Sequence, residues 1–299
     1  MSFDYVVTLL AKSWNGERAD SFLAQARSHG LALQVGQPIR LEGTSVWMQR
    51  AQAASHCSLN GDSLGALREE AERLHLDVFV ESEELFHTPR RLFAFDMDST
   101  LIQAEIVDEL AGLAGVKGEV SAITESAMRG EIDFPTSLTR RVSLLKGVPH
   151  ESIGTLQTKI ALGDGLESLM AGLKAAGCKT AILSGGFTFF ARYLQESLGF
   201  DYVCANELEI VDGALTGNLA TTIVDGKRKA SELKAMASNE KIPLEQTVAA
   251  GDGANDLPML SEAGTGVAYH AKPIVRATAE FRLNYCGLDA LLHLLERSK

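Results

Sequence analysis

The sequence contains little cysteine and no evident cysteine–histidine motif. Its four cysteines among 299 residues are Cys57, Cys178, Cys204 and Cys286. They are scattered along the chain, with no close pair and no histidine at the spacing of a metal-ligand pair. This pattern argues against a disulfide-stapled fold and against a zinc site. It is typical of free thiols in a reducing compartment.

Long apolar segments are also missing. The N-terminal apolar run from Val6 to Ala11 is short, is interrupted by Thr8 and follows Asp4. A membrane-spanning helix needs about 20 apolar residues, and a signal peptide begins with basic residues. Neither pattern is present, so we expect a cytoplasmic protein with no membrane partner. Low-complexity tracts and internal repeats are absent as well, so every long segment can contribute to a packed core.

Positive charge is in deficit. The chain has 28 lysines and arginines against 39 acidic residues, for a net charge of −11. This balance argues against nucleic acid or an anionic membrane surface as a partner. A small anionic substrate remains compatible with it, because a metal ion and a few placed cations can reverse the potential inside one cleft.

Residues 1–85 are predicted to form a separate α+β domain. Strand patterns occur at 4–11, 31–35, 45–51 and 76–80, and helical patterns at about 17–29 and 64–74. The resulting order, β-α-β-β-α-β, matches the ferredoxin-like plan. The acidic stretch 81–89 ends in proline, and we place the domain boundary there.

Residues 90–299 are predicted to form an α/β domain with a parallel sheet. Apolar strand patterns occur at 91–95, 179–183, 202–205, 247–250, 266–268 and 282–284, with helical patterns between most of them. Such alternation favours a Rossmann-like sheet covered on both faces. Asp212-Gly213 predicts a hairpin turn without a chemical role.

An all-helical block, about residues 104–176, is inserted after the first strand of this sheet. Five helical patterns follow one another there, and they cannot lie within the sheet. We expect them to form a cap over the C-terminal edge of the strands, where ligands bind in such folds.

Two acids follow the first predicted strand of the α/β domain. Asp96 and Asp98 stand two residues apart, so an extended backbone projects them in similar directions. Unpaired carboxylates so close together repel each other, and a divalent cation such as Mg²⁺ would remove that cost. A metal-bound carboxylate is also a suitable nucleophile toward phosphorus. A solvated turn with helix-capping acids is an equally good interpretation of this pair alone.

A second acidic cluster, residues 251–256, follows the strand pattern 247–250. Asp252 and Asp256 are four residues apart and share a face if a helix begins there. Glycines on either side of Asp252 permit a tight turn and a close approach of the backbone to a ligand. Together with Asp96 and Asp98, this cluster would supply oxygen ligands from a second strand end. A capped helix after a glycine-rich turn is the alternative.

Two further elements have the chemistry of a phosphate site. Ser184-Gly185-Gly186 follows a strand pattern, and a hydroxyl with free backbone N–H groups can bind phosphate. Lys229 precedes a helical pattern, where an anion would offset its repulsion by the helix dipole. A lysine there could stabilise a transferring phosphoryl group. Taken singly, both are also explained as a common turn and a solvated basic patch.

These elements, in this order, resemble the four motifs of the haloacid dehalogenase superfamily: Asp96-Met97-Asp98-Ser99-Thr100, Ser184-Gly185-Gly186, Lys229 and Gly251-Asp252-Gly253-Ala254-Asn255-Asp256. The resemblance covers about residues 90–299. Glu105 and the segment 140–147 are similar to the phosphoserine phosphatase branch in particular, and the inserted block resembles its helical cap.

This resemblance implies a Mg²⁺-dependent phosphatase that forms an aspartyl-phosphate on Asp96. Asp98 would be the general acid and base, and its main-chain carbonyl would join Asp96 and Asp252 as a metal ligand. Asp256 would lie close behind the metal. The phosphoryl oxygens would be held by Ser184, Gly185, Lys229 and Asn255.

The resemblance also implies O-phosphoserine as substrate and serine biosynthesis as the setting. Phosphoserine carries an ammonium and a carboxylate, so a selective site needs one acid and one bidentate cation beyond the phosphate site. Glu105 and Arg141 would take these parts, and Met128 and Phe134 would line the pocket. From the residues alone, a surface acid and a solvated arginine are the simpler interpretation.

The N-terminal domain resembles a regulatory domain of the ACT type, by element order and position only. For this domain we consider three roles: binding of an amino-acid ligand such as serine, formation of a homodimer, or a purely structural role. For the chain as a whole, one alternative is a phosphatase or phosphotransferase acting on a related compound such as phosphohomoserine. A non-catalytic amino-acid sensor is another, and the intact set of acids and Lys229 argues against it.

Overall fold

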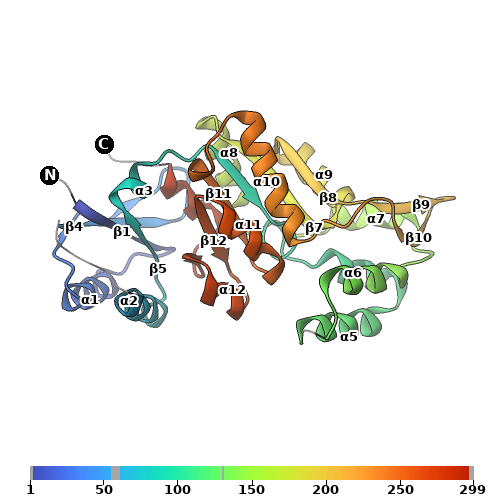
Figure 1. Cartoon of the computed structure of the whole chain (residues 1–299), viewed down its shortest axis with the longest axis horizontal. Coiled ribbons are helices and arrows are strands. Elements are labelled where there is room, and N and C mark those ends of the chain that lie inside the picture. Colours follow the sequence, from blue (N-terminus) through green and yellow to red (C-terminus); the bar gives the residue numbers. More distant parts are fainter. Residues whose placement is uncertain (1–2, 55–60, 130, 296–299) are drawn as a thin grey trace. The chain divides into compact units, whose positions relative to one another are not determined.

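The computed structural model describes residues 3–54, 61–129 and 131–295 (Figure 1). The chain divides into two compact units, which are treated separately below. The first unit combines Met1–Arg91, Asp164–Cys178 and Val267–Lys299, and the second combines Leu92–Gly163 and Lys179–Gly266. Within the described residues, no helix is both long enough and apolar enough to cross a membrane.

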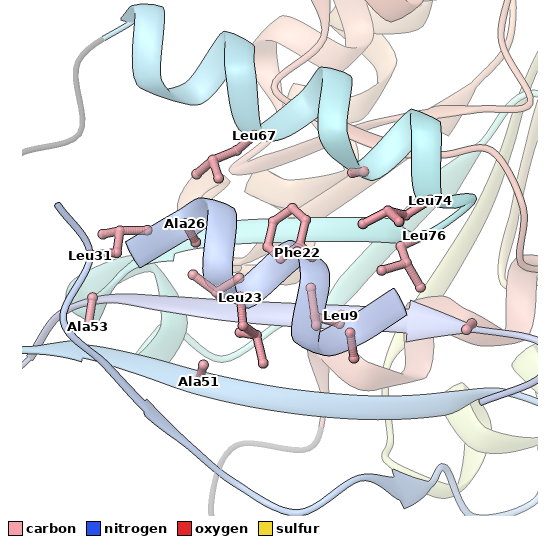
Figure 2. Close-up of a cluster of buried hydrophobic side chains, with 14 residues drawn as sticks. Leu9, Phe22, Leu23, Ala26, Leu31, Ala51, Ala53, Leu67, Leu74 and Leu76 are labelled. Carbon is pink, nitrogen blue, oxygen red and sulfur yellow. The ribbon is translucent and has the colours of Figure 1, made fainter. Parts of the chain in front are cut away.

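The first unit contains an antiparallel sheet of order β2-β4-β1-β5, with β3 paired to β4. Its strands are β1 (Phe3–Ala11), β2 (Leu33–Val35), β3 (Ile39–Arg40), β4 (Trp47–Ala54) and β5 (Asp77–Ser82). Two helices, α1 (Gly16–Ser28) and α2 (Gly61–Leu74), lie on one face of this sheet (Figure 2). The element order is therefore the predicted one, with the two-residue strand β3 in addition.

The alternation of side chains along β1 explains how its two faces are filled. Leu9 points toward α1 and α2 and packs with Phe22 of α1 and Leu67 of α2 (Figure 2). Val7, two residues earlier on the same face of β1, belongs to the same apolar cluster. Val6 points the other way and packs against Phe86. Helix α1 buries residues three, four and seven apart, which is the spacing of a single helical face.

The segment predicted as a linker contains a short helix. Helix α3 (Glu83–His87) follows β5 directly, and the Ser82 hydroxyl caps it by accepting a hydrogen bond from Leu85 N at 3.2 Å. The other elements of the first unit are α8 (Leu166–Ala175), α12 (Pro273–Thr278), β13 (Phe281–Leu283) and the 3₁₀ helix η3 (Leu288–Leu294). Strand β12 (Thr265–Tyr269) begins in the second unit and pairs in parallel with β13 from Val267 onward.

The second unit contains parallel strands in the order β11-β6-β7-β8. They are β6 (Leu92–Phe95), β7 (Lys179–Phe187), β8 (Tyr202–Asn206) and β11 (Thr247–Gly251). All four residues of β6 are buried, as expected for a central strand covered on both faces. Helices α9 (Thr188–Leu198), α10 (Gly226–Glu240) and α11 (Leu257–Glu262) alternate with these strands. The parallel α/β architecture predicted from the sequence is confirmed.

Two insertions depart from this alternation. The hairpin of β9 (Leu208–Val211) and β10 (Ala214–Leu219) turns at Asp212 and Gly213, which both have positive φ, as predicted. The helical block after β6 consists of α4 (Ile106–Ala114), α5 (Lys117–Met128), α6 (Phe134–Ser143) and α7 (His150–Gln157). The fifth predicted helix of the block is α8, which groups with the first unit.

Candidate active site

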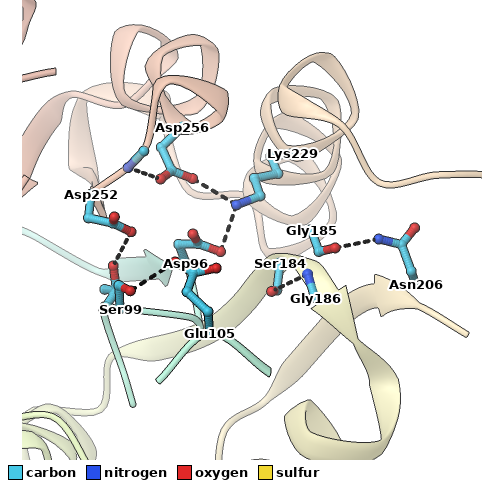
Figure 3. A network of polar contacts seen from close by, with 12 residues as sticks. Asp96, Ser99, Glu105, Ser184, Gly185, Gly186, Asn206, Lys229, Asp252 and Asp256 are labelled. Atoms are coloured by element: carbon cyan, nitrogen blue, oxygen red, sulfur yellow. Dashed lines mark hydrogen bonds and ion pairs between the residues drawn. The ribbon is translucent and has the colours of Figure 1, made fainter. Parts of the chain in front are cut away.

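Three segments of the second unit bring ionisable side chains together. Asp96 follows β6, and Asp256 ends the short 3₁₀ helix η2 (Ala254–Asp256) that follows β11. Lys229 reaches them from the first turns of α10 and donates to Asp96 Oδ1 and to Asp256 Oδ1, each at 2.7 Å (Figure 3). The Lys229 side chain is fully buried, so these two carboxylates hold its charge inside the protein.

A third carboxylate lies beside these two. Oxygen atoms of Asp96, Asp252 and Asp256 all come within 4.8 Å of one another, and all three residues are buried. Asp256 also accepts a hydrogen bond from Gly253 N at 2.9 Å, which fixes its second oxygen. A methyl group at Gly251 would lie 2.5 Å from the Asp256 carboxyl group, so this close packing requires glycine. The three oxygens form a donor set of the kind that Mg²⁺ prefers.

The charges in this cluster shift one another's pKa values. Burial acts to lower the pKa of Lys229, but the carboxylates of Asp256 and Asp96 outweigh it, and the net shift is upward. Burial, aided by the nearby charge of Asp96, raises the pKa of Asp256 to about 6. One lysine therefore does not offset all the negative charge that the cluster carries when its acids are ionised.

Asp98 lies in the turn after Asp96. Asp98 is half-buried, and its Oδ1 atom is buried without a hydrogen-bond partner among the described residues. Burial raises the pKa of Asp98 well above its usual value, and the negative charges of Glu105 and Asp96 raise it further. The turn places Ser99 at a positive φ of 56°, and the Ser99 hydroxyl donates to Glu105 Oε1 at 2.9 Å. These effects favour the protonated form of Asp98 relative to a solvent-exposed aspartate.

Helix α6 contributes a buried cation. Arg141 is 9% exposed, and its Nε lies 3.4 Å from the Ser137 carbonyl oxygen. Burial lowers the pKa of Arg141, while the charges of Glu105, Asp108 and Asp98 act in the opposite direction. The structure therefore brings Arg141 into the electrostatic range of Glu105, Asp108 and Asp98.

The remaining predicted residues are distributed around this centre. The Phe134 ring lies over Gly185, since a methyl group on Gly185 would approach Phe134 Cζ to 2.7 Å. The Asn255 side chain lies over Gly253. The main-chain carbonyl oxygen of Asn255 lies against Gly226, the first residue of α10. Met128 is the last residue of α5, and its side chain lies outside the described part of the structure.

The segment Ser184-Gly185-Gly186 differs from its prediction as a strand end. It lies inside β7, which continues to Phe187. The Ser184 hydroxyl oxygen accepts a hydrogen bond from Gly186 N at 2.8 Å, and the Gly185 carbonyl accepts one from Asn206 Nδ2 at 2.8 Å. Strand pairing resumes at Phe187, which is why the strand extends past the turn-forming residues.

Three polar residues of the site were not predicted from the sequence. Thr100 Oγ1 lies 3.4 Å from Asp252 Oδ1, Ser99 contacts Glu105, and Asn206 contacts Gly185. Ser99 and Thr100 belong to the nucleophile motif, so their position next to Asp98 was a usable signal. Asn206 is the last residue of β8 and lies in no motif.

Comparison with known proteins identifies the family. The family model of haloacid dehalogenase-like hydrolases matches residues 93–261. The chain belongs to this family. The matched segment of the hydrolase contains both acidic clusters, the serine of β7 and the lysine of α10.

Two sequence relatives of this hydrolase are phosphoserine phosphatases. The one from Archaeoglobus fulgidus is 47% identical over 231 residues, covering 76% of this chain and 67% of the relative. The one from Mycobacterium tuberculosis is 46% identical over 230 residues, covering 77% of this chain and 56% of the relative. This chain thus matches only about half to two thirds of the length of these two proteins.

Solved structures agree with the fold. A HAD family hydrolase from Salmonella enterica serovar Typhi is 33% identical, with a TM-score of 0.90, over 99% of both chains. A phosphoserine phosphatase with a phospho-aspartyl intermediate analogue is 40% identical, with a TM-score of 0.66, over 70% of this chain and all of that one. The first match extends over both units, and the second covers a smaller part of this chain.

Proposed function

We propose that this hydrolase is a Mg²⁺-dependent phosphatase that converts O-phosphoserine to serine and phosphate. The observation that carries the proposal is the contact of Lys229 with Asp96 and Asp256 beside Asp252, together with the half-buried Glu105 whose charge acts on the buried Arg141. The named relatives supply independent support for this substrate. The product would be serine, so the reaction would complete a serine-forming route.

In this proposal Asp96 is the nucleophile and Asp98 the general acid and base. An Asp96 oxygen attacks phosphorus, the bond from phosphorus to the serine oxygen breaks, and Asp98 gives its proton to that oxygen. The raised pKa of Asp98 supports this part, because the group must be protonated at the outset. Asp98 then accepts a proton from the water that hydrolyses the aspartyl-phosphate.

The donor set fits a magnesium ion. Asp96, Asp252 and the main-chain carbonyl of Asp98 would hold it, and the clustered carboxylate oxygens support this assignment. When bound, Mg²⁺ supplies positive charge to the phosphoryl oxygens and balances the acids. Asp256 would act behind these ligands by holding Lys229, as its 2.7 Å contact indicates.

The rest of the site would divide between the two ends of the substrate. Lys229, Ser184, Gly185 and Asn255 would hold the phosphoryl oxygens. Glu105 would bind the ammonium group and Arg141 the carboxylate, with Phe134 and Met128 beside them. The burial of Arg141 near three acids supports this role, because a substrate carboxylate would add a partner for its guanidinium.

The test is phosphate release from O-phosphoserine by the purified protein, with Mg²⁺ and with EDTA. We expect activity with Mg²⁺ only, and none above background for Asp96→Asn. Equal phosphate release by wild type and Asp96→Asn would contradict the proposal. Phosphohomoserine should be the poorer substrate when the two are compared side by side.

Arg141→Ala tests the assignment of the substrate. The loss of a charge-assisted contact should lower kcat/KM for phosphoserine by roughly 10²-fold. The same variant should keep most of its activity on p-nitrophenyl phosphate, which has no carboxylate for Arg141 to bind. Equal losses on the two substrates would remove Arg141 from substrate recognition.

For the N-terminal residues 1–85 we propose an ACT-like domain. The strand order β2-β4-β1-β5 with two helices on one face supports this proposal. We also propose that the domain boundary lies at residues 85–90 and that residues 104–176 form a cap. Binding of serine to this domain, and a homodimer, are tested by calorimetry with serine and by light scattering of the full chain.

A further inference from the structure

The pairing of β7 with β8 is interrupted next to the proposed phosphate site. Leu183 pairs with Cys204, and the next recorded pair is Phe187 with Asn206. Three residues of β7, Ser184 to Gly186, therefore face the single residue Ala205 of β8. Such a bulge removes backbone groups from the ladder of strand hydrogen bonds, and those groups need other partners.

The side chain of Asn206 supplies one of these partners. Asn206 is fully buried. Its Nδ2 donates to the Gly185 carbonyl oxygen at 2.8 Å, and its Oδ1 accepts from Val224 N at 2.8 Å. A backbone N–H can only donate, so Val224 requires the oxygen of the amide and leaves the nitrogen for Gly185. The amide therefore has one orientation that satisfies both contacts.

The contact with Gly185 has a consequence for Ser184. The Gly185 carbonyl and the Gly186 N–H belong to one planar trans peptide, so they point in opposite directions. By holding the carbonyl, Asn206 aims the N–H, which donates to Ser184 Oγ at 2.8 Å (Figure 3). Because this bond uses a lone pair of Oγ, the Ser184 hydroxyl proton is directed elsewhere.

The bulge also has little room to move. A methyl group at Gly186 would lie 2.9 Å from Asp98 Oδ2 and 2.8 Å from Met97 Cε. The peptide that Asn206 holds is thus packed against the segment that follows Asp96. A small rotation of this peptide would move the Ser184 hydroxyl and press on the Asp98 side chain.

We infer that Asn206 is a positioning residue that acts through the Gly185–Gly186 peptide to orient the Ser184 hydroxyl as a donor to a phosphoryl oxygen. This inference rests on the proposed phosphatase function. Asn206 itself contacts the peptide and Val224, and it acts on the reaction only through Ser184.

Asn206→Asp is the direct test. The substitution keeps the shape and the acceptor toward Val224, but it places an oxygen opposite the Gly185 carbonyl. We expect kcat/KM to fall by roughly 10²-fold, the size of effect that a small misplacement of a catalytic group produces. The matched control is Asn239→Asp, the same change at an exposed position of α10, which should stay within twofold of wild type.

Repeating the substitution in a Ser184→Ala background distinguishes a positioning role of Asn206 from a defect in folding. In Ser184→Ala the proposed target is missing, so adding Asn206→Asp should cost less than about threefold more. An equal loss in both backgrounds would overturn the inference, because a purely structural defect does not depend on Ser184. Asn206→Ser offers a hydroxyl that can again donate toward Gly185, and it should recover part of the loss. If Asn206→Asp does not fold, Asn206→Ser takes its place in both backgrounds.

All rates are measured on phosphoserine and on p-nitrophenyl phosphate. Ser184 would contact the phosphoryl group, which both substrates share, so the Asn206 variants should lose activity equally on both. Activity on the aryl phosphate without activity on phosphoserine would refute the proposed substrate and leave this inference testable. Wild-type rates for Asn206→Asp on both substrates would overturn the inference and leave the phosphatase function in place.

Discussion

Both units of this hydrolase bury charged side chains, and an ion pair of the first unit differs in balance from the acid cluster of the second. In the first unit Glu81 and Arg90 form an ion pair at 3.5 Å, and their side chains are 1% and 0% exposed. Arg90 also donates to the carbonyl oxygens of Thr88 and Leu85. In this pair one acid faces one base, and backbone groups add to the contacts, as expected of a structural pair.

The second unit buries a surplus of acid instead. Lys229 pairs with Asp96 and Asp256, Asp252 lies beside these two acids, and the charges of Asp96 and Lys229 also act on Asp98. Burying this arrangement is costly for stability alone, and it becomes favourable when a divalent cation or a proton is added. The excess of acid around Lys229 therefore distinguishes this cluster from the balanced pair of Glu81 and Arg90.

The largest expected effect follows from removing the lysine of the unbalanced cluster. Lys229→Met keeps the length of the side chain but removes the charge that pairs with both carboxylates and that would, in the proposed function, hold the phosphoryl oxygens. We expect kcat/KM for phosphoserine at saturating Mg²⁺ to fall by roughly 10³-fold, as for other lost transition-state contacts. Lys234→Met is the control, because Lys234 lies in the same helix and pairs with Glu262 at the surface. A Lys229→Met rate within tenfold of wild type would contradict the assignment.

The balanced pair should respond in the opposite way. Glu81→Gln leaves Arg90 buried without its counter-charge, and the free energy of unfolding should fall by about 3 kcal/mol. Activity per folded molecule should not change. Urea denaturation measures the first quantity, and kcat at low temperature the second. Glu70→Gln is the control, because its partner Arg73 is 62% exposed, and its cost should stay below about 1 kcal/mol.

Much of the candidate site was predictable because its acids directly follow strands of a parallel sheet. Asp96 and Asp252 follow the adjacent parallel strands β6 and β11, so the topology alone brings them together. Lys229 was predicted from its place in the order of the four motifs that the sequence resembles. Its pairing with Asp256 was not, because that contact depends on the direction in which η2 leaves the strand.

Other features depend on contacts that no local pattern records. Asn206 acquires its contacts from the bulge in β7, and the bulge is visible only in the register with β8. Glu81 and Arg90 flank a segment whose acids and proline are typical of a linker. In the structure Phe86 of α3 packs on Val6, and this contact anchors the segment to the first unit.

Magnesium should stabilise the protein through the unbalanced cluster. At a Mg²⁺ concentration 100 times its dissociation constant, the free energy of unfolding should rise by about 2.7 kcal/mol relative to EDTA. Asp252→Asn removes one donor and should abolish most of this gain. Glu81→Gln should lower stability in both conditions and keep the full difference between them. If Mg²⁺ stabilised Asp252→Asn as much as wild type, the metal would not be bound by these acids.

The smallest expected effect on stability comes from an exposed pair of the second unit, Arg129 and Glu131. The hydrogen bond from Arg129, aided by one from Ser126, lowers the pKa of Glu131 to about 2. Because the folded state lowers this pKa, the carboxylate stabilises the fold above its ordinary pKa of 4.5, and the contribution fades as the pH falls toward 2. Glu131→Gln should therefore be slightly less stable than wild type at pH 7.

Urea denaturation of the two proteins at pH 7 and at successively lower pH checks this sign. The difference in unfolding free energy should shrink below about pH 4.5, where the unfolded-state carboxyl begins to bind its proton. Glu131 is exposed, so solvent screens the pair and even the full difference should be small. A difference that stays constant over this range would mean that Glu131 acts through packing. In that case Glu131 would stabilise this unit through the contacts of its side chain and not through its charge.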